Sequence, residues 1–178
     1  MNNDKNMLRH TVTVCLLAML VAVSHIVLAD ELGMVAGGLD GYLGLALNYQ
    51  SAALWQGTLV TRPLDVSLEY SLGRVQAPAG QSNRNLAHIG LTPFARWWLT
   101  SNTGAELGVG ANVFSGTRLG DKNISTAFQF GSSLGLFHRL EHSPWLFGLR
   151  LTHYSNAGIK EPNSGQNYVQ LRASYVFP

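Results

Sequence analysis

The chain has 178 residues, a formal net charge of +2 and a single cysteine. Nucleic-acid binding gets no support from this charge, because it needs a strongly basic surface, and one cysteine excludes an intrachain disulfide. Charged residues make up 12% of the chain, about half of the usual share in soluble domains. No segment after residue 29 has the roughly 18 unbroken apolar residues of a membrane-spanning helix. Low charge without such a helix is typical of a β-barrel, whose apolar surface is spread over alternate residues.

The N-terminal segment has the layout of a secretory signal peptide. Two basic residues precede the apolar run "VTVCLLAMLVAVSHIVLA", and Val27 and Ala29 occupy the small-residue positions before a cleavage site. A membrane anchor is the alternative, but His25 interrupts the run. We expect residues 1–29 to be a signal peptide that contains Cys15, and residues 30–178 to form a single β-barrel domain without thiols.

The rest of the chain alternates between apolar and polar or small residues. In "GYLGLALNY" (41–49) every odd-numbered residue from Leu43 is large and apolar or aromatic, and the same period of two recurs down the chain. This period predicts strands. We expect eight, at residues 33–39, 41–54, 64–73, 85–98, 104–115, 124–138, 145–157 and 167–177. Eight antiparallel strands of this length make the smallest common outer-membrane barrel.

Alternation alone does not say which face points outward, since a soluble lipocalin-like barrel has the same pattern with its apolar face inside. The low charge favours the membrane barrel. Tryptophans near strand ends suit its aromatic girdle; they are Trp55, Trp97, Trp98 and Trp145. The charged residues of luminal parity can pair inside the barrel; they are Glu69, Arg96, Glu106, Arg150 and Arg172. Side chains fill an eight-stranded barrel, so we expect no pore.

The connections differ in length. Those at 74–84, 116–123 and 158–166 are long and polar, whereas those near 100–104 and 140–144 are short. Because long loops of such barrels face outside and short turns face the periplasm, the loop after the seventh strand is predicted to be extracellular.

That loop continues the stretch "HYSNAGIKEPNSGQN", residues 153–167. His153 and Ser155 share the parity of the outward-facing leucines of the seventh strand, which places both on the lipid-facing wall near its outer end. Asn167 has outward parity on the neighbouring strand. Polar groups facing lipid are costly, and a histidine beside a serine is the usual base for an activated nucleophile.

With "FSGTRLGDKN" at 114–123 and the signal-plus-barrel layout, this stretch resembles the outer-membrane lipid A 3-O-deacylase family, PagL type. The resemblance is close in these two motifs and loose elsewhere. It implies a cofactor-free, metal-free esterase of the Gram-negative outer membrane that acts on lipid A of lipopolysaccharide, with Ser155 as nucleophile and His153 as general base. It also implies that Asn156 and the amides near Ala157 and Gly158 bind the oxyanion, and that Asn163 shapes the loop.

Asn167 departs from the family pattern, which has a glutamate at this position. Three explanations are open. Asn167 orients His153 without charge, as the asparagine of a Cys-His-Asn site does; or Glu161 folds back to replace the missing acid; or the chain is a weakened or inactive relative.

Other candidate residues have mainly structural interpretations. His88 has luminal parity and is expected to be a hydrogen-bonded interior histidine, and His138 and His142 flank a periplasmic turn. Loop cations are either solvated or available to lipid A phosphates; they are Arg74, Arg84, Arg118, Lys122 and Lys160.

Two other functions compete with the esterase. One is a non-catalytic structural or adhesion barrel; the other is a different lipid-modifying barrel, a phospholipase or palmitoyl transferase. In each case we expect a membrane-embedded monomer or weak homodimer.

The predicted cleavage site is directly testable. We expect the purified mature protein to begin at Asp30 and to fractionate with the outer membrane. N-terminal sequencing checks the first point and membrane fractionation the second. Met1 at the N-terminus, or recovery in the soluble periplasm, would contradict the prediction.

Overall fold

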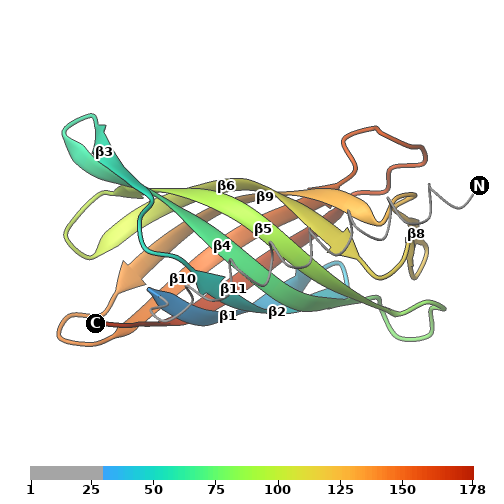
Figure 1. Cartoon of the computed structure of the whole chain (residues 1–178). Helices are drawn as coiled ribbons and strands as arrows, with labels where there is room; N and C mark the ends of the chain where they lie inside the picture. The colour runs from blue at the N-terminus through green and yellow to red at the C-terminus, as the bar shows by residue number, and fades with distance from the viewer. Residues whose placement is uncertain (1–29) are drawn as a thin grey trace, which may run out of the picture.

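The computed structural model describes residues 30–178 as a closed antiparallel β-barrel of eight strands (Figure 1). The predicted signal peptide lies outside the described residues. The barrel strands are β1 (Glu31–Leu39), β2 (Tyr42–Gln50), β4 (Arg62–Gln76), β5 (Asn85–Trp98), β6 (Thr103–Phe114), β9 (Phe128–Arg139), β10 (Trp145–Ser155) and β11 (Gln166–Val176). Each pairs with its neighbours along the chain, β1 also pairs with β11, and pairing of β2 with β4 completes the ring. The predicted fold class is therefore confirmed.

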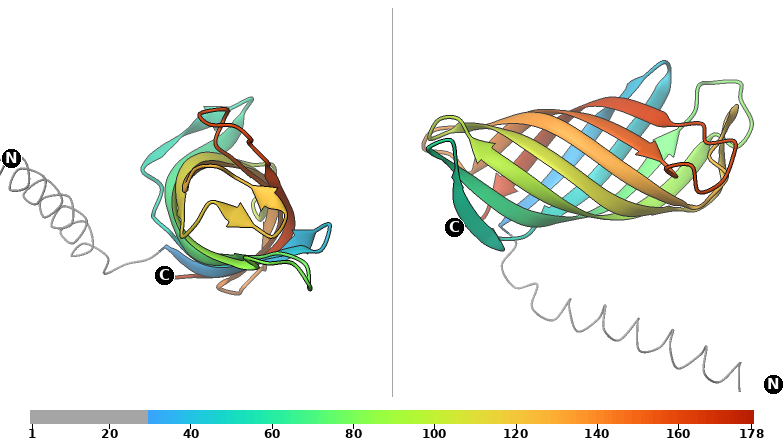
Figure 2. Two further views of the ribbon diagram at one scale, coloured as in Figure 1. Left: turned by 90° about the vertical axis from the view of Figure 1, so that its right-hand side faces the viewer. Right: turned by 90° about the horizontal axis from the view of Figure 1, so that it is seen from above.

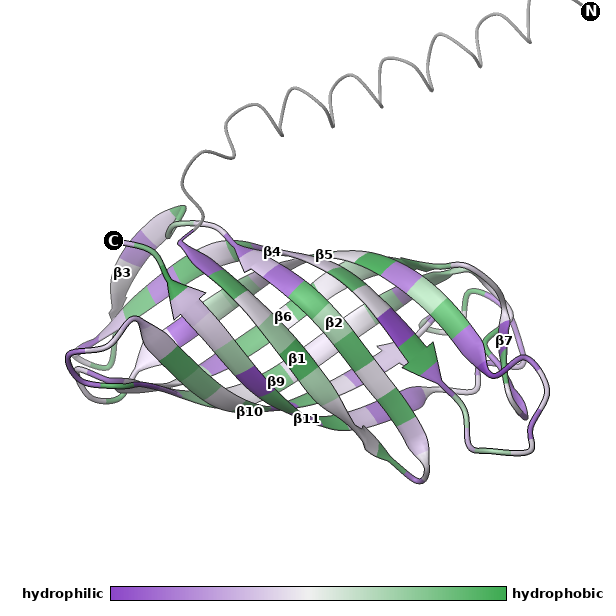
Figure 3. Ribbon diagram, turned by 90° about the horizontal axis from the view of Figure 1, so that it is seen from below, coloured by the Kyte–Doolittle hydropathy of each residue, from purple (hydrophilic) through white to green (hydrophobic). Residues whose placement is uncertain are grey.

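The alternation in the sequence becomes an apolar outer wall and a polar interior. Along β2, Leu43, Leu45 and Leu47 are exposed while the residues between them are buried. Figure 3 shows the same alternation of hydrophobic and hydrophilic residues along the ribbons. Residues 30–178 contain no helix of the length and hydropathy needed to cross a membrane.

Several strand boundaries differ from the sequence prediction. β1 begins at Glu31, two residues earlier than expected, because this carboxylate is buried inside the barrel. An additional strand, β3 (Trp55–Leu59), pairs with the first residues of β4 and forms a hairpin at the end where the C-terminus lies (Figure 1). Trp55 therefore lies on this hairpin and not at the end of a barrel strand.

The strand expected at 124–138 begins only at Phe128, because the preceding residues cover the opposite end of the barrel. Viewed along the barrel axis, the small hairpin of β7 (Arg118–Leu119) and β8 (Lys122–Asn123) lies across the opening (Figure 2). Leu119 and Ile124 are fully buried in one cluster with residues such as Tyr42 and Tyr168. The longer loops lie at this end, which is the extracellular end of such barrels.

The lumen contains a closed network of three carboxylates and three guanidinium groups. Glu106 contacts all three arginines: its oxygens lie 2.7 Å from Arg150, 2.9 Å from Arg172 and 3.3 Å from Arg96. Glu69 pairs with Arg150 at 2.9 Å. The predicted pairing of luminal charges is confirmed.

Glu31 joins this network as a member that the sequence prediction left out. It pairs with Arg172 at 2.6 Å and also with Arg96. Three positive and three negative side chains then balance one another, as burial of charge requires.

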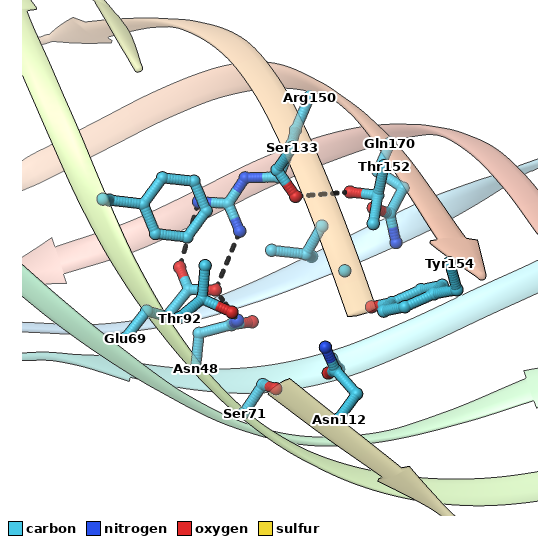
Figure 4. Close-up of a pocket in the computed structure, with 14 residues that line it drawn as sticks. Asn48, Glu69, Ser71, Thr92, Asn112, Ser133, Arg150, Thr152, Tyr154 and Gln170 are labelled. Atoms are coloured by element: carbon cyan, nitrogen blue, oxygen red, sulfur yellow. Dashed lines mark hydrogen bonds and ion pairs between the residues drawn. The ribbon is translucent and has the colours of Figure 1, made fainter. Parts of the chain in front are cut away.

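The lumen is packed with side chains. A polar cavity of about 30 Å³ lies beside Glu69 and Arg150. Figure 4 shows Arg150 bonded to Glu69, and Ser133 to Thr152, around it. A cavity of this size holds about one water molecule.

Removing one member of the network should destabilise the barrel. Arg150→Met leaves Glu69 and Glu106 short of a cation, and uncompensated buried charge costs about 3–5 kcal/mol. The free energy of unfolding, measured in urea with the protein in lipid vesicles, should fall by that amount. Arg62→Met is the matched control, because Arg62 is exposed and forms no ion pair within residues 30–178; its effect should stay below about 0.5 kcal/mol. An Arg150→Met barrel as stable as the control would contradict the network's role.

Candidate active site

His153 and Ser155 lie near the extracellular end of β10, on the outer wall of the barrel. The strand alternates, with Leu149, Leu151 and His153 exposed and the residues between them directed inward. In the strand register His153 is opposite Ser132 of β9 on one side and Asn167 of β11 on the other. Three polar side chains therefore form a row across three strands of a wall that is otherwise apolar.

His153 is held by Asn167. The imidazole Nδ1 lies 2.7 Å from Asn167 Oδ1. Because the partner atom is a carbonyl oxygen, Nδ1–H donates and Nε2 keeps its lone pair. Ser155 is two residues further along the same strand face, and Nε2 is the imidazole nitrogen that Asn167 leaves free.

Glu161, the alternative orienting group, is engaged elsewhere. Its Oε2 accepts a hydrogen bond from the backbone N–H of Asn163 at 2.8 Å, and its side chain is exposed on the loop. The structure brings Asn167, and not Glu161, to His153.

An apolar depression of about 370 Å³ adjoins His153 and Asn167 on the outer wall. Leucine and valine side chains of several strands line most of it; they are Leu39, Leu107, Leu134, Leu151 and Val169. Its lining residues come from neighbouring strands that run from β6, through β9, β10 and β11, to β1. An acyl chain can therefore lie against the wall with its polar end at His153.

The loop after Ser155 is folded around Asn156, which is fully buried. The Asn156 side chain donates to the carbonyl oxygens of Ile124 at 3.1 Å and Lys160 at 2.7 Å, and it accepts from the Gly158 N–H at 2.9 Å. The Asn156 N–H itself donates to Asn163 Oδ1 at 3.0 Å. In this conformation Asn156 and Gly158 serve to hold the loop.

Two other donors of this loop make no hydrogen bond within residues 30–178. They are the backbone N–H of Ala157 and the side-chain amide nitrogen of Asn163. Ala157 has a φ of 53°, which costs a residue with a Cβ about 1 kcal/mol. Strained backbone conformations of this kind cluster at functional sites, where a loop must hold its amides and side chains in particular directions.

The comparisons with known proteins identify the family of the chain. The family model described as "Lipid A 3-O-deacylase (PagL)" matches residues 41–176, which include the whole of the loop and its flanking strands. A lipid A deacylase PagL of Bordetella bronchiseptica is 39% identical over 140 residues, covering 78% of each chain. The chain belongs to the PagL family. It is therefore an ester hydrolase of the outer membrane.

Two further relatives are similar over different extents. A lipid A deacylase PagL of Pseudomonas aeruginosa is 42% identical over 60 residues, which is 34% of each chain. The crystal structure of the outer membrane enzyme PagL superposes with a TM-score of 0.71 at 20% identity, covering 83% of this chain and 99% of that one. This second likeness establishes the shared barrel fold.

Ser132 is the residue of this PagL-family site that the sequence prediction overlooked. It is exposed on β9 at the position facing His153, and it lines the depression. The sequence does contain a signal for it. In "FQFGSSLGL" (128–136) Ser132 is the one polar residue among the outward positions, which is the same anomaly that drew attention to His153.

The other histidines among residues 30–178 lie away from the site. His88 is buried as predicted, but its ring stacks on Phe114 at 5.0 Å and packs near Tyr154. Its Nδ1 has no hydrogen-bond partner among the described residues, so the expected hydrogen bond is replaced by aromatic packing. His138 bonds Thr103 Oγ1 at 2.8 Å, at the periplasmic end.

Proposed function

We propose that this chain hydrolyses the 3-O-linked acyl ester of lipid A in the outer leaflet, with Ser155 as nucleophile, His153 as general base and Asn167 as orienting group. The observation that carries the proposal is the 2.7 Å contact between His153 Nδ1 and Asn167 Oδ1 on a lipid-facing wall. In the neutral imidazole this contact puts the lone pair on Nε2, on the same strand face as a serine. Membership of the PagL family supplies the substrate class.

The first half of the reaction forms an acyl-enzyme. Ser155 Oγ attacks the ester carbonyl carbon while His153 Nε2 takes the hydroxyl proton. The carbonyl oxygen becomes an oxyanion, for which the Ala157 N–H and the Asn163 side-chain amide are the free donors. Collapse of the tetrahedral intermediate breaks the bond to the sugar oxygen, which leaves with the proton from His153.

The second half returns the enzyme to its starting state. Water enters from the extracellular end, His153 Nε2 takes one of its protons, and the hydroxide adds to the acyl carbon. Collapse releases the fatty acid, and Ser155 Oγ regains its proton from His153. Protons and charge balance over the two steps without a cofactor.

The position of the site explains how a lipid substrate can reach it. Lipid A diffuses laterally in the outer leaflet, and its acyl chain can enter the depression beside Leu134 and Leu151 without leaving the membrane. The sugar and its phosphates then lie at the level of the extracellular loops, where Arg118 is exposed.

Loss of either reacting group should abolish activity without unfolding the barrel. Ser155→Ala and His153→Ala are each expected to remove deacylation, because both side chains lie on the outer wall away from the luminal network. Mass spectrometry of lipid A incubated with each protein detects the loss of one acyl chain, and heat-dependent gel mobility reports folding. Ser164→Ala, in the same loop, is the control and should stay within about two-fold of the native rate. Native turnover in either variant would refute its assigned role.

Asn167 offers a second test, because it orients His153 but cannot stabilise the imidazolium that forms during attack. Asn167→Asp places a carboxylate where the amide now lies, and Asn167→Glu restores the family residue. Loss of the acid from a serine triad can cost about 10⁴ in turnover, and screening is weak near lipid. Both variants should therefore raise kcat by roughly ten-fold or more.

Asn167→Ala is the matched control that removes the hydrogen-bond partner of His153 altogether, and it should lower kcat. The assay is deacylation of purified lipid A in detergent at equal protein concentration. If neither carboxylate raises kcat, or if alanine equals the native residue, Asn167 is not the orienting group, and Glu161 is the next position to mutate.

A further inference from the structure

Lys122 is bound to the active loop instead of extending into solvent. It begins the short strand β8 in the hairpin that covers the barrel. Its Nζ donates to the backbone carbonyl oxygen of Gly165 at 2.9 Å and lies 4.5 Å from the centroid of the Tyr42 ring. The Tyr42 hydroxyl in turn bonds Asp121, the residue before Lys122. The ammonium thus has two partners from separate parts of the chain, Gly165 and Tyr42, and the Tyr42 ring is itself held by its bond to Asp121.

Gly165 lies directly against the imidazole of His153. A Cβ built on Gly165 would be 2.7 Å from His153 Cε1 and 3.5 Å from Nε2. A side chain at this position would press on the imidazole, so the Gly165 backbone forms one wall beside the ring. Two residues later Asn167 binds Nδ1. The short segment 165–167 therefore contacts the imidazole both at its ring carbon and at its hydrogen-bonding nitrogen.

The segment is held in place from the neighbouring loop. Asn123 accepts a hydrogen bond from the Ser164 N–H at 3.2 Å, and Ser125 donates to the Pro162 carbonyl oxygen at 2.7 Å. Among these bonds the one from Lys122 is closest to the histidine, because its acceptor belongs to Gly165. It is also the only charge-assisted one, and such bonds are stronger than neutral ones.

We propose that Lys122 is a positioning residue for His153. By binding the Gly165 carbonyl it fixes the backbone wall that limits rotation of the imidazole, and so keeps Nε2 directed at Ser155. The inference rests on the proposed function, in which His153 is the base. It differs from the interpretation of Lys122 as a solvated cation or a ligand for substrate phosphate, because it predicts an effect on esters that carry no charge.

The test compares kcat and KM on two substrates. Purified protein in detergent is assayed with lipid A and with an uncharged p-nitrophenyl acyl ester. Lys122→Met should lower kcat on both by about ten-fold or more, since small misplacements of reacting groups cost up to about 10², with KM within about two-fold. Lys122→Arg keeps the donor and should recover most of the loss. Lys160→Met, an exposed lysine of the active loop, should leave kcat on the uncharged ester unchanged.

A double-mutant cycle tests whether Lys122 acts through Gly165. Gly165→Ala should itself lower kcat by pushing on the imidazole. The double variant Lys122→Met/Gly165→Ala should be no slower than the slower single variant, because both changes disturb the same wall. Effects that multiply would overturn the proposal. So would a Lys122→Met effect confined to KM for lipid A, which would instead make Lys122 a phosphate ligand.

A readout independent of turnover separates this inference from the proposed function. With ¹³Cε1-labelled histidine, the His153 signal is identified by its loss in His153→Ala. It should shift or broaden in Lys122→Met and remain native in Lys160→Met, whether or not the ester is hydrolysed. An unchanged His153 signal in a folded Lys122→Met protein would overturn the positioning role even if the native enzyme is fully active.

Discussion

Closure of the sheet by the pairing of β2 with β4 is the constraint from which the other features follow. In lipid every backbone N–H and C=O of a spanning segment must be paired, and only a closed barrel does this for strands. Closure gives each strand one face in lipid and one in the lumen, so side-chain parity decides the environment of every residue. Charges must then lie inside and compensate one another, as the three carboxylates and three arginines around Glu106 do. The same constraint makes Ser132, His153 and Asn167 anomalous, since all three are polar and face outward.

The active site proposed on the outer wall makes demands that differ from those of a pocket enzyme. The acyl chain needs no cavity, because the depression beside β9 and β10 continues into the apolar phase around the barrel. The reacting groups, however, are not surrounded by protein on all sides. His153 is fixed instead by a strand neighbour, Asn167, and by the Gly165 backbone, which Lys122 holds from the adjacent hairpin. The hairpin thus serves both as the cover of the lumen, through Leu119 and Ile124, and as the support of the active loop.

The sequence predicts the barrel well because its signal is repeated in every strand. The parity of Leu149 and Leu151 is enough to place His153 and Ser155 on the wall, and the parity of Val169 places Asn167 beside them. The features that the sequence does not reveal depend on local contacts, which leave no periodic pattern in the sequence. The β3 hairpin and the short pair β7 and β8 are too brief to alternate, and the inclusion of Glu31 in β1 depends on arginines far along the chain. The close approach of Gly165 to His153, and the bond from Lys122 that holds it, arise from loop packing that spacing alone cannot predict.

The central claim is that Ser155 is the nucleophile of a site on the lipid-facing wall. Covalent labelling tests it most directly. The purified protein in detergent is treated with a long-chain alkyl fluorophosphonate, which phosphonylates activated serines, and the modified residue is located by peptide mass spectrometry. The account predicts a single adduct on Ser155, formed in parallel with loss of activity and absent in His153→Ala. An adduct on Ser132 or any other serine, or full activity in protein whose Ser155 is completely modified, would contradict it.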